Sequence, residues 1–423
     1  MAEKYFHTHI SSELVQVAVE DLRVGMYVSK LDRPWLESSF LFQGFEIRND
    51  DDIAAVKAQC NYVYVDVSRE IKVPVIFSRN TAYSKATLNK IPPPSKRSSF
   101  AKEIKHAEYV HNKTSTIVKS FMQEVQLGRP ISVEVAKQAV AECVDSVINS
   151  PDALLLMGQL KNKDEYTAQH SMNVCIYSIA LGRHLNLSIE ELKNLGLCGM
   201  MHDMGKMFVP LEVLNKPGKL TPEELTLMQS HATRGWKLLL STPNMAGNAI
   251  DVAYTHHERL DGTGYPRQLK DEQLSFFTRI VAISDTYDAI SSDRVYQKGR
   301  THLEAIKILN DISGTHLDST LTIRFIECIG IYPAGCIVEM SNGEVALVLE
   351  INRRAKIRPK VLLLLDEDKK PRKERIIDLT KIDLDASGQR YAVRNVVRPE
   401  TYGINLLDYY NRGILMQKFT ESG

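Results

Sequence analysis

The chain has 423 residues, with 53 basic and 52 acidic side chains and a formal net charge of +1. This length predicts two or three domains, and a hydrophobic content of 43% is enough to build a sizeable core. A net charge so close to zero argues against a broad footprint for a nucleic-acid polymer, although it leaves room for a local basic pocket.

Neither a membrane span nor a secretory signal is expected. The sequence has no run of about 18 apolar residues and no basic-then-apolar start. The cysteines are scattered without a CxxC pair, which favours reduced, mostly buried thiols in the cytoplasm over a disulfide framework or a zinc–thiolate site. They are Cys60, Cys143, Cys175, Cys198, Cys328 and Cys336.

The first 70 residues are predicted to form a small α/β domain. Residues 62–67 alternate apolar and polar side chains as a strand does, and residues 50–59 are a short helix candidate. Residues 71–99, which include three consecutive prolines at 92–94, are expected to form a linker. Trp35 could stack on a ligand, but a packed or partly exposed aromatic is the simpler reading.

Helical periodicity begins at Phe100 and indicates a helical domain over 100–332, with its core at 160–325. The first two helices, broken at Arg129-Pro130, could relay a signal, form a dimer face or simply pack on their neighbours. Thr221-Pro222-Glu223-Glu224 is a strong helix start, with an N-cap residue, a proline and an acid. The other expected helices span 188–201, 248–257 and 278–291, with one beginning at 302 and one ending near 329.

Residues 333–423 change pattern again and predict a β-rich appendage with a tail. Asn342-Gly343 between two apolar runs indicates a hairpin, and 361–365 is a further strand candidate. The basic stretch 369–373 is interpreted as a solvated loop, and 404–410 as a helix candidate. The fold class is therefore mainly α: a helical bundle with a small α/β domain before it and a β-rich appendage after it.

Seven histidine and aspartate residues fall on or at the ends of expected helices, as a metal site in a helical bundle requires. Any one of them alone would be an ordinary core or surface residue. Imidazole and carboxylate donors without thiolate suit iron, manganese or zinc better than calcium. Seven donors are more than one tetrahedral ion can bind, and they are about the right number for two octahedral ions that share a carboxylate. The seven are His170, His202, Asp203, His231, His256, His257 and Asp285.

Two motifs carry a family resemblance. His202 to Lys206 matches HDxGK, and His256 to Pro266 matches HHExxDGxGYP throughout. The chain thereby resembles the HD-GYP family, a branch of the HD-domain metal-dependent phosphohydrolases, over residues 160–325. Its N-terminal region is similar to a small domain often found ahead of HD-GYP in bacterial proteins of this length.

The resemblance implies a dinuclear centre bridged by Asp203. One ion would be held by His170, His202, Asp203 and Asp285, and the other by Asp203, His231, His256 and His257. Iron is the first expectation for both ions, then manganese, with zinc, nickel or cobalt as alternatives. Some members bind a third ion through a glutamate one turn before the first histidine. Here that position is Tyr166, and Glu165 is turned away by about 100°, so two ions are expected.

The family hydrolyses cyclic di-GMP, a bacterial second messenger, to the linear dinucleotide and in many members on to GMP. Lys206 could place its ammonium group on a nonbridging phosphate oxygen. Arg294 matches the arginine that contacts substrate phosphate in the family. Tyr265, Gly262 and Gly264 would shape the loop that admits a cyclic dinucleotide.

Other polar residues near the motifs receive structural roles. Glu258 and Asp261 are expected to cap or brace the loop, and Asp288 to orient a histidine. His302 and His316 lie outside the motif pattern and are expected to be ordinary core or surface histidines with no part in the metal site.

Three functions remain open. The first is a phosphodiesterase acting on cyclic di-GMP or on 3′,3′-cyclic GMP-AMP. The second is a non-catalytic receptor that binds the nucleotide and signals through a protein partner. The third is an HD phosphohydrolase acting on another nucleotide, against which the Gly-Tyr-Pro segment weighs. A homodimer or a signalling partner is compatible with the first two.

Overall fold

A computed structural model describes most of the chain, which divides into two compact units, Met1–Ala86 and Thr87–Gly423. The expected linker and Trp35 lie outside the described residues. None of the helices in the described part of the chain combines the length and the apolar content needed to cross a membrane. The described residues are 14–22, 24, 26–33, 38, 40, 44–47, 50–66, 100–159, 166–292, 299–352 and 354–412.

The described residues of the N-terminal unit form a four-stranded antiparallel sheet, the 3-10 helix η1 (Val19–Asp21) and the helix α1 (Asp50–Lys57), so the α/β prediction is confirmed. The strand order is β1-β4-β2-β3. Alternation in the last strand buries Val63 and Val65, which share a core with Val28 and Val56. The strands are β1 (Leu14–Ala18), β2 (Tyr27–Leu31), β3 (Phe45–Glu46) and β4 (Tyr62–Asp66).

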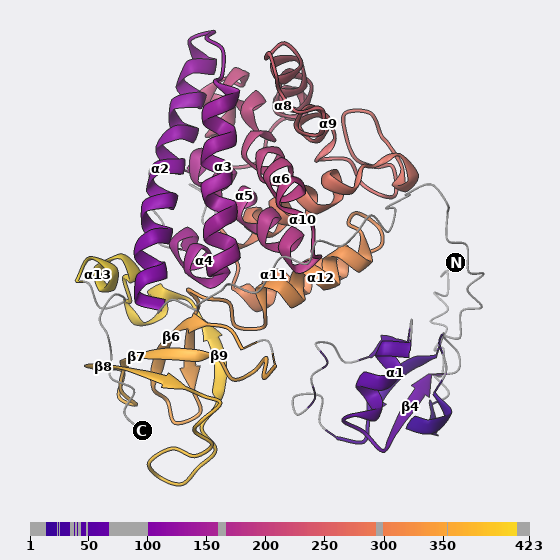
Figure 1. Cartoon of the computed structure of the whole chain (residues 1–423), viewed down its shortest axis with the longest axis vertical. Helices are drawn as coiled ribbons and strands as arrows, with labels where there is room; N and C mark the ends of the chain where they lie inside the picture. Colours follow the sequence, from indigo (N-terminus) through magenta and orange to yellow (C-terminus); the bar gives the residue numbers. More distant parts are fainter. Residues whose placement is uncertain are drawn as a thin grey trace, which may run out of the picture. The chain divides into compact units, whose positions relative to one another are not determined.

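The second unit begins with α2 (Phe100–Gln126) and α3 (Val133–Asn149), which lie side by side (Figure 1). The hydroxyl of Ser132 caps α3 by accepting from the Val135 N–H at 3.4 Å. Both helices pack on α5, and α2 also packs on α4 (Pro151–Gln159). They therefore belong to the same core as the helices that carry the candidate ligands.

Five further helices surround the candidate site, and α5 is central because it packs on α2, α3, α4, α6, α10 and α12. The predicted starts at Ser188 and Thr221 are confirmed, since each forms a reciprocal capping box with the glutamate three residues later. The five are α5 (Tyr166–His184), α6 (Ile189–Met201), α8 (Pro222–Leu240), α9 (Gly247–Thr255) and α10 (Phe276–Ser291).

Shorter elements complete the helical part. The HDxGK segment continues into the 3-10 helix η4 (Met204–Phe208), followed by the short helix α7 (Leu211–Leu214). Another 3-10 helix, η5 (Asp271–Gln273), precedes α10. The helices expected from His302 and up to Ile329 are α11 (His302–Asp311) and α12 (Ser319–Ile329).

The C-terminal part is a five-stranded antiparallel sheet of order β8-β7-β6-β5-β9, drawn in orange to yellow in Figure 1. The Asn342-Gly343 hairpin is confirmed, with Gly343 at φ +92°. One face, which includes Ile337 and Leu347, joins the helical core, where α4 packs on β6. The strands are β5 (Ile337–Met340), β6 (Val345–Glu350), β7 (Lys360–Leu365), β8 (Pro371–Asp378) and β9 (Val393–Val397).

The interpretation of 369–373 as a solvated loop is wrong for most of its length, because β8 begins at Pro371 and pairs with Leu365. β8 is an edge strand whose side chains alternate in exposure: Lys373 and Arg375 are exposed, whereas Arg372 pairs with Glu344 and Glu374 with Arg412. Lys369 is also bound, and donates to Glu339 at 3.1 Å. The tail contains η6 (Pro399–Tyr402) and α13 (Leu406–Asn411), close to the helix expected at 404–410.

The mainly helical class with α/β and β-rich additions is thus confirmed.

Candidate metal centre

The ends and inner faces of five helices bring all seven candidate donors into one buried cluster. His170 comes from α5, His202 and Asp203 from the end of α6, and Asp285 from α10. His231 projects from α8, and His256 and His257 end α9. The donors form two groups in which the ligand atoms lie within 4.8 Å of one another. The groups are Asp203, His231, His256 and His257, and His170, His202 and Asp285.

Backbone carbonyl groups fix the tautomers of three histidines. Their Nδ1 atoms must carry the hydrogen, because a carbonyl oxygen only accepts. A ring of this tautomer, when neutral, presents a lone pair at Nε2, the form in which imidazole binds metals. His202 donates to Gly199 at 2.7 Å, His231 to Met228 at 2.7 Å, and His256 to Val252 at 3.0 Å.

These lone pairs face one another and a carboxylate. The Nε2 atoms of His231 and His256 are 3.4 Å apart, and Asp203 Oδ1 lies 3.4 Å from the first and 3.7 Å from the second. Within the described part of the chain, His202 Nε2 and Asp203 Oδ1 are buried without a hydrogen-bond partner. Buried polar atoms that converge without a hydrogen-bond partner need another source of stabilisation, and a bound cation would supply it.

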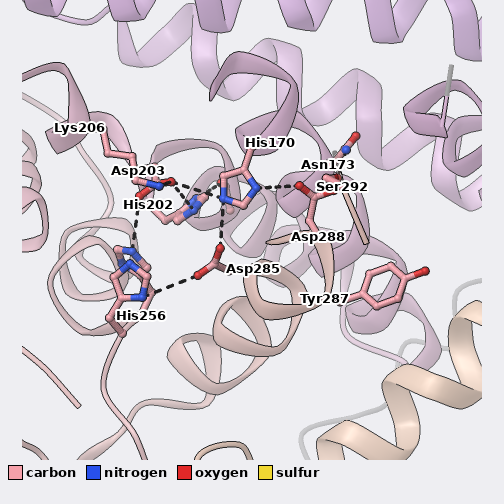
Figure 2. A network of polar contacts seen from close by, with 12 residues as sticks. His170, Asn173, His202, Asp203, Lys206, His256, Asp285, Tyr287, Asp288 and Ser292 are labelled. Carbon is pink, nitrogen blue, oxygen red and sulfur yellow. Dashed lines mark hydrogen bonds and ion pairs between the residues drawn. The ribbon is translucent and has the colours of Figure 1, made fainter. Parts of the chain in front are cut away.

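His170 links the cluster to a further carboxylate (Figure 2). Its Nε2 lies 3.4 Å from Asp203 Oδ2 and 3.1 Å from Asp285 Oδ1. On the opposite side of the ring, Nδ1 donates to Asp288 Oδ2 at 2.7 Å. The expectation that Asp288 orients a histidine is thereby confirmed.

The electrostatics of the cluster follow from burial and from its carboxylates. Burial lowers the pKa of His231 to about 3, so this ring is neutral. Burial also acts to lower the pKa of His170, but Asp203, Asp285 and Asp288 outweigh it and raise that pKa well above its ordinary value. Burial acts to raise the pKa of Asp203, yet the Lys206 ammonium and the neighbouring imidazoles hold it well below its usual range. Asp203 is therefore an anion.

Gly205 sets the position of the HDxGK segment. A methyl group on Gly205 would overlap the His231 carbonyl oxygen and the Gly235 amide, because η4 lies directly on the backbone of α8. This close packing holds Asp203 beside the His231 ring. Lys206 Nζ, one turn on, reaches Asp203 Oδ2 at 2.5 Å.

The loop after His257 is braced by its own carboxylates, as expected. Glu258 accepts from the Arg267 N–H at 2.6 Å and from the Leu269 N–H at 2.9 Å. Asp261 accepts from the backbone and the hydroxyl of Thr263, at 2.9 and 2.7 Å. Both side chains are thus engaged in holding the loop.

The Gly-x-Gly-Tyr-Pro part of the loop folds back over the histidines. Gly262 has φ +78°, in the left-handed region that favours glycine. A Cβ on Gly264 would lie 2.5 Å from Glu258 Cα, so this position also needs glycine. The Tyr265 ring stacks on His257 with centroids 4.7 Å apart, and the Tyr265 N–H donates to the His257 carbonyl at 3.2 Å. Tyr265 therefore covers one side of the metal centre.

Some candidates are placed elsewhere or are not described. Arg294 and Glu165 lie outside the described residues, and Tyr166 is the first residue of α5. His302 is buried in a structural role, with Nε2 donating to the Gly330 carbonyl at 2.9 Å. His316 lies 3.8 Å from Asp261, away from the cluster.

Sequence reasoning missed several supporting residues. Asn173 is three residues after His170, and Gly235 is four residues after His231. Helical spacing alone places each of these on the same face as its histidine, so a signal was present. The third supporting residue is His111 on α2, which contacts Gln169 on α5. The two are 58 residues apart in the sequence, and no local pattern connects them.

Comparison with known proteins gives the family. A family model described as HD domain matches residues 155–321. The chain is 36% identical over 369 residues to a Pseudomonas aeruginosa protein named cyclic di-GMP phosphodiesterase, covering 86% of this chain and 89% of that protein. The chain belongs to the HD-GYP family. The resemblance indicated by HDxGK and HHExxDGxGYP is confirmed.

Other matches cover parts of this HD-GYP protein. A domain of unknown function (DUF3391) matches 14–136, and a KOW domain associated with HD domain matches 337–400. A Vibrio cholerae protein named 3′3′-cGAMP-specific phosphodiesterase 1 is 36% identical over 168 residues, which is 40% of this chain and 39% of that protein. A solved HDG"Y"P protein from Bdellovibrio bacteriovorus aligns with TM-score 0.45 and 17% identity, over 74% of this chain and 98% of that one.

Proposed function

We propose that this HD-GYP protein hydrolyses a phosphodiester bond of a 3′,3′-cyclic dinucleotide, with cyclic di-GMP as the first candidate substrate. The observation that carries the proposal is the convergence of three metal-donor atoms on one point: His231 Nε2, His256 Nε2 and Asp203 Oδ1 lie within 3.7 Å of one another. Such a set fits a divalent cation. The relatives named above, which are phosphodiesterases by name, support the substrate class.

Two divalent cations fit the two donor groups, with Asp203 between them. Its Oδ1 faces His231 and His256, and its Oδ2 faces His170 and His202, at 3.4 and 3.2 Å. One carboxylate thus contributes to both groups. When bound, such ions neutralise phosphate charge and lower the pKa of a coordinated water toward neutrality. Iron is proposed as the resident metal, with manganese next and zinc, nickel or cobalt after them, because nitrogen and oxygen donors without thiolate suit these ions.

Lys206 is proposed to bind the phosphate. Its ammonium group contacts Asp203 at 2.5 Å, and its side chain is 20% exposed. A cation at the rim of the cluster can donate to a nonbridging phosphate oxygen, where charge grows as the phosphorus is attacked. Arg294 is proposed for a second phosphate contact on its match to the family alone. Tyr265, held over His257 by the loop, is proposed to close the substrate side.

The reaction is tested with metal-loaded full-length protein and cyclic di-GMP, with the products separated by chromatography. Release of the linear dinucleotide, with or without GMP, supports the proposal. Tight binding with no product, in protein shown to hold its metal, would favour the receptor alternative. A chelated sample, which lacks the metal, and the Asp203→Asn variant, which lacks the Asp203 carboxylate, serve as controls.

The choice of nucleotide is the finer part of the proposal. Metal and phosphate contacts are common to all cyclic dinucleotides, and relatives named for cyclic di-GMP and for cGAMP both match this chain. The match to the first kind covers far more of the chain, which supports cyclic di-GMP. Side-by-side kcat/KM values for the two nucleotides decide it.

The remaining proposals concern the domain boundaries, the cellular compartment and the partners of the protein. We infer an α/β domain over 1–70, a linker over 71–99, the catalytic domain over 100–332 and a β-rich appendage over 333–423. Separate family models for an HD domain over 155–321 and a KOW domain over 337–400 support the division between the middle and last parts, whereas the DUF3391 match over 14–136 runs across the proposed linker into the first helices of the second unit. Free cysteines, five of them buried, support a reducing cytoplasm. A homodimer or a signalling partner is compatible with the proposed function.

A further inference from the structure

A chain of hydrogen bonds leads from the metal centre to α2. His170 Nδ1 donates to Asp288 Oδ2 at 2.7 Å, and Asn173 Nδ2 donates to Asp288 Oδ1 at 2.8 Å. Gln169 Nε2 lies 3.0 Å from Asn173 Oδ1 and 3.2 Å from His111 Nε2. Figure 2 shows the inner part of this chain, with Asn173 on the far side of Asp288 from His170.

The chemistry of the groups gives every bond one direction. An amide nitrogen only donates, so Gln169 gives one hydrogen to Asn173 Oδ1 and the other to His111 Nε2. The Asn173 amide then donates to Asp288, whose other oxygen accepts from His170. His111 Nε2 is therefore an acceptor. Each member is satisfied by the next, and Nε2 is the His170 ring atom turned to the cluster.

The residues of this hydrogen-bond chain are buried and closely packed, so their side chains have little freedom to move. His111, Asn173, Asp288 and His170 are all at most 7% exposed. Gly158 of α4 packs so closely that a Cβ there would lie 2.9 Å from Asn173 Oδ1. Ser292 Oγ donates to Asp288 Oδ1 at 3.0 Å and fixes that carboxylate from α10. A displacement of His111 must therefore be passed on to Gln169 and Asn173 or leave a buried acceptor unpaired.

We propose that His111 is a positioning residue for the metal centre, which couples the placement of α2 to His170 through Gln169, Asn173 and Asp288. α2 lies outside the matched HD domain, which begins at residue 155, and is the first helix after residues 67–99. Any influence that moves α2 relative to α5 would thus change how firmly His170 holds its ion. The inference rests on the proposed metal centre.

The test measures metal release rather than turnover. Full-length protein is loaded with Mn²⁺, and the rate of Mn²⁺ transfer to a chromogenic chelator is followed. His111→Leu removes the bond between His111 and Gln169 and should release Mn²⁺ about three- to tenfold faster. This is less than the roughly 10–100-fold expected for a group that bonds a ligand directly. Gln169→Met removes the bond to His111 and the bond to Asn173 as well, so it should release Mn²⁺ at least as fast. His111→Gln, which offers an amide oxygen to Gln169, should restore most of the retention.

Thr114→Val is the matched control. Thr114 is also fully buried on α2 and contacts Cys143 Sγ at 3.5 Å, but it has no bond to Gln169 in the described structure. It should lower thermal stability as His111→Leu does and leave the release rate within about twofold of wild type. Gln169→Met supplies the comparison if His111→Leu fails to fold, because Gln169 is only partly buried.

The double variant separates coupling from general loosening. If His111 acts through Gln169, His111→Leu with Gln169→Met should release Mn²⁺ no faster than Gln169→Met alone. Multiplicative effects in the double variant, or equal release from His111→Leu and Thr114→Val, would overturn the proposal. A wild-type chain that bound no Mn²⁺ would overturn the metal centre itself, and the positioning role with it.

Discussion

Gly205 lies directly against the backbone of His231, so that a side chain at Gly205 would overlap the His231 carbonyl oxygen. The neighbouring contact is Gly235 on the same helix, which is itself a glycine. Two glycines thus allow η4 and α8 to touch through their backbones. This contact sets the distance between Asp203, two residues before Gly205, and His231.

Gly205→Ala should therefore separate η4 from α8 and lower both metal content and stability. The obstacle is backbone and not a flexible side chain, so we expect a destabilisation of about 1–3 kcal/mol, the usual range for overpacking. Denaturant unfolding and elemental analysis measure the two effects. Gly247→Ala is the control, because a Cβ there meets nothing within 4 Å and the residue begins α9. If Gly205→Ala kept the metal content of wild type, the proposed role of Gly205 in setting the distance between Asp203 and His231 would be contradicted.

Asp203→Asn should be the most damaging conservative change in the metal centre. The amide keeps the shape of the side chain but removes the negative charge that faces both donor groups. We expect loss of metal and of hydrolysis with helix content retained, as measured by elemental analysis and circular dichroism. Asp261→Asn, a change in a loop-bracing carboxylate, should keep both. Full metal and normal turnover in Asp203→Asn would refute the dinuclear assignment.

Lys206→Met should separate phosphate binding from metal binding. If the ammonium donates to phosphate, the variant should keep two ions and lose on the order of 10²–10³ in kcat, or about 3–4 kcal/mol. Lys216→Met removes a comparable lysine–carboxylate pair, to Glu224 at 2.5 Å, away from the cluster and should keep full activity. Loss of metal from Lys206→Met would mean that Lys206 chiefly holds Asp203 in place.

Much of this arrangement was predictable because its signals are local. Capping boxes at Ser188 and Thr221, the helical periods and the Asn342-Gly343 turn act within a few residues of sequence. The seven donors could be chosen because each lies at an expected helix or helix end. Fold class and donor set therefore needed no knowledge of tertiary contacts.

The parts that sequence reasoning missed depend on contacts between distant segments. The sequence of β8 indicates a loop because its charged residues hide the alternation of an edge strand that pairs with β7. His111 and Gln169 are brought together only by the packing of α2 on α5. The need for glycine at 205 arises because α8 passes against it. None of these features has a signature within its own segment.

The number of ions provides a further prediction. Among the described residues the donors form two groups, and the position one turn before His170 is Tyr166, the first residue of α5. A phenol with a pKa near 10 is a poor ligand. We therefore expect two ions per chain in protein purified without oxygen and with sufficient iron. Elemental analysis that gave three ions consistently, reduced to two in Glu165→Gln, would show that Glu165 reaches the centre.

His302 should make stability depend on pH. Burial lowers the pKa of this imidazole to about 4, although its bond to the Gly330 carbonyl acts in the opposite direction. Above pH 6.5 the ring is neutral in both the folded and the unfolded chain and has no effect. Between pH 6.5 and 4 the unfolded chain binds a proton that the folded chain does not. The free energy of unfolding should therefore fall as the pH falls, by up to about 3 kcal/mol in total.

The measurement compares wild type with His302→Gln, both free of metal, by denaturant unfolding at several pH values from 7.5 to 4.5. The glutamine amide can still donate to Gly330 but does not titrate, so the variant should lose less stability on acidification. Other groups also titrate in this range, so the slope of the free energy of unfolding against pH is not informative for either protein alone. The test is the difference between the slopes of wild type and His302→Gln. Identical slopes would show that the fold does not resist protonation of His302, and that its burial imposes no linkage of stability to pH.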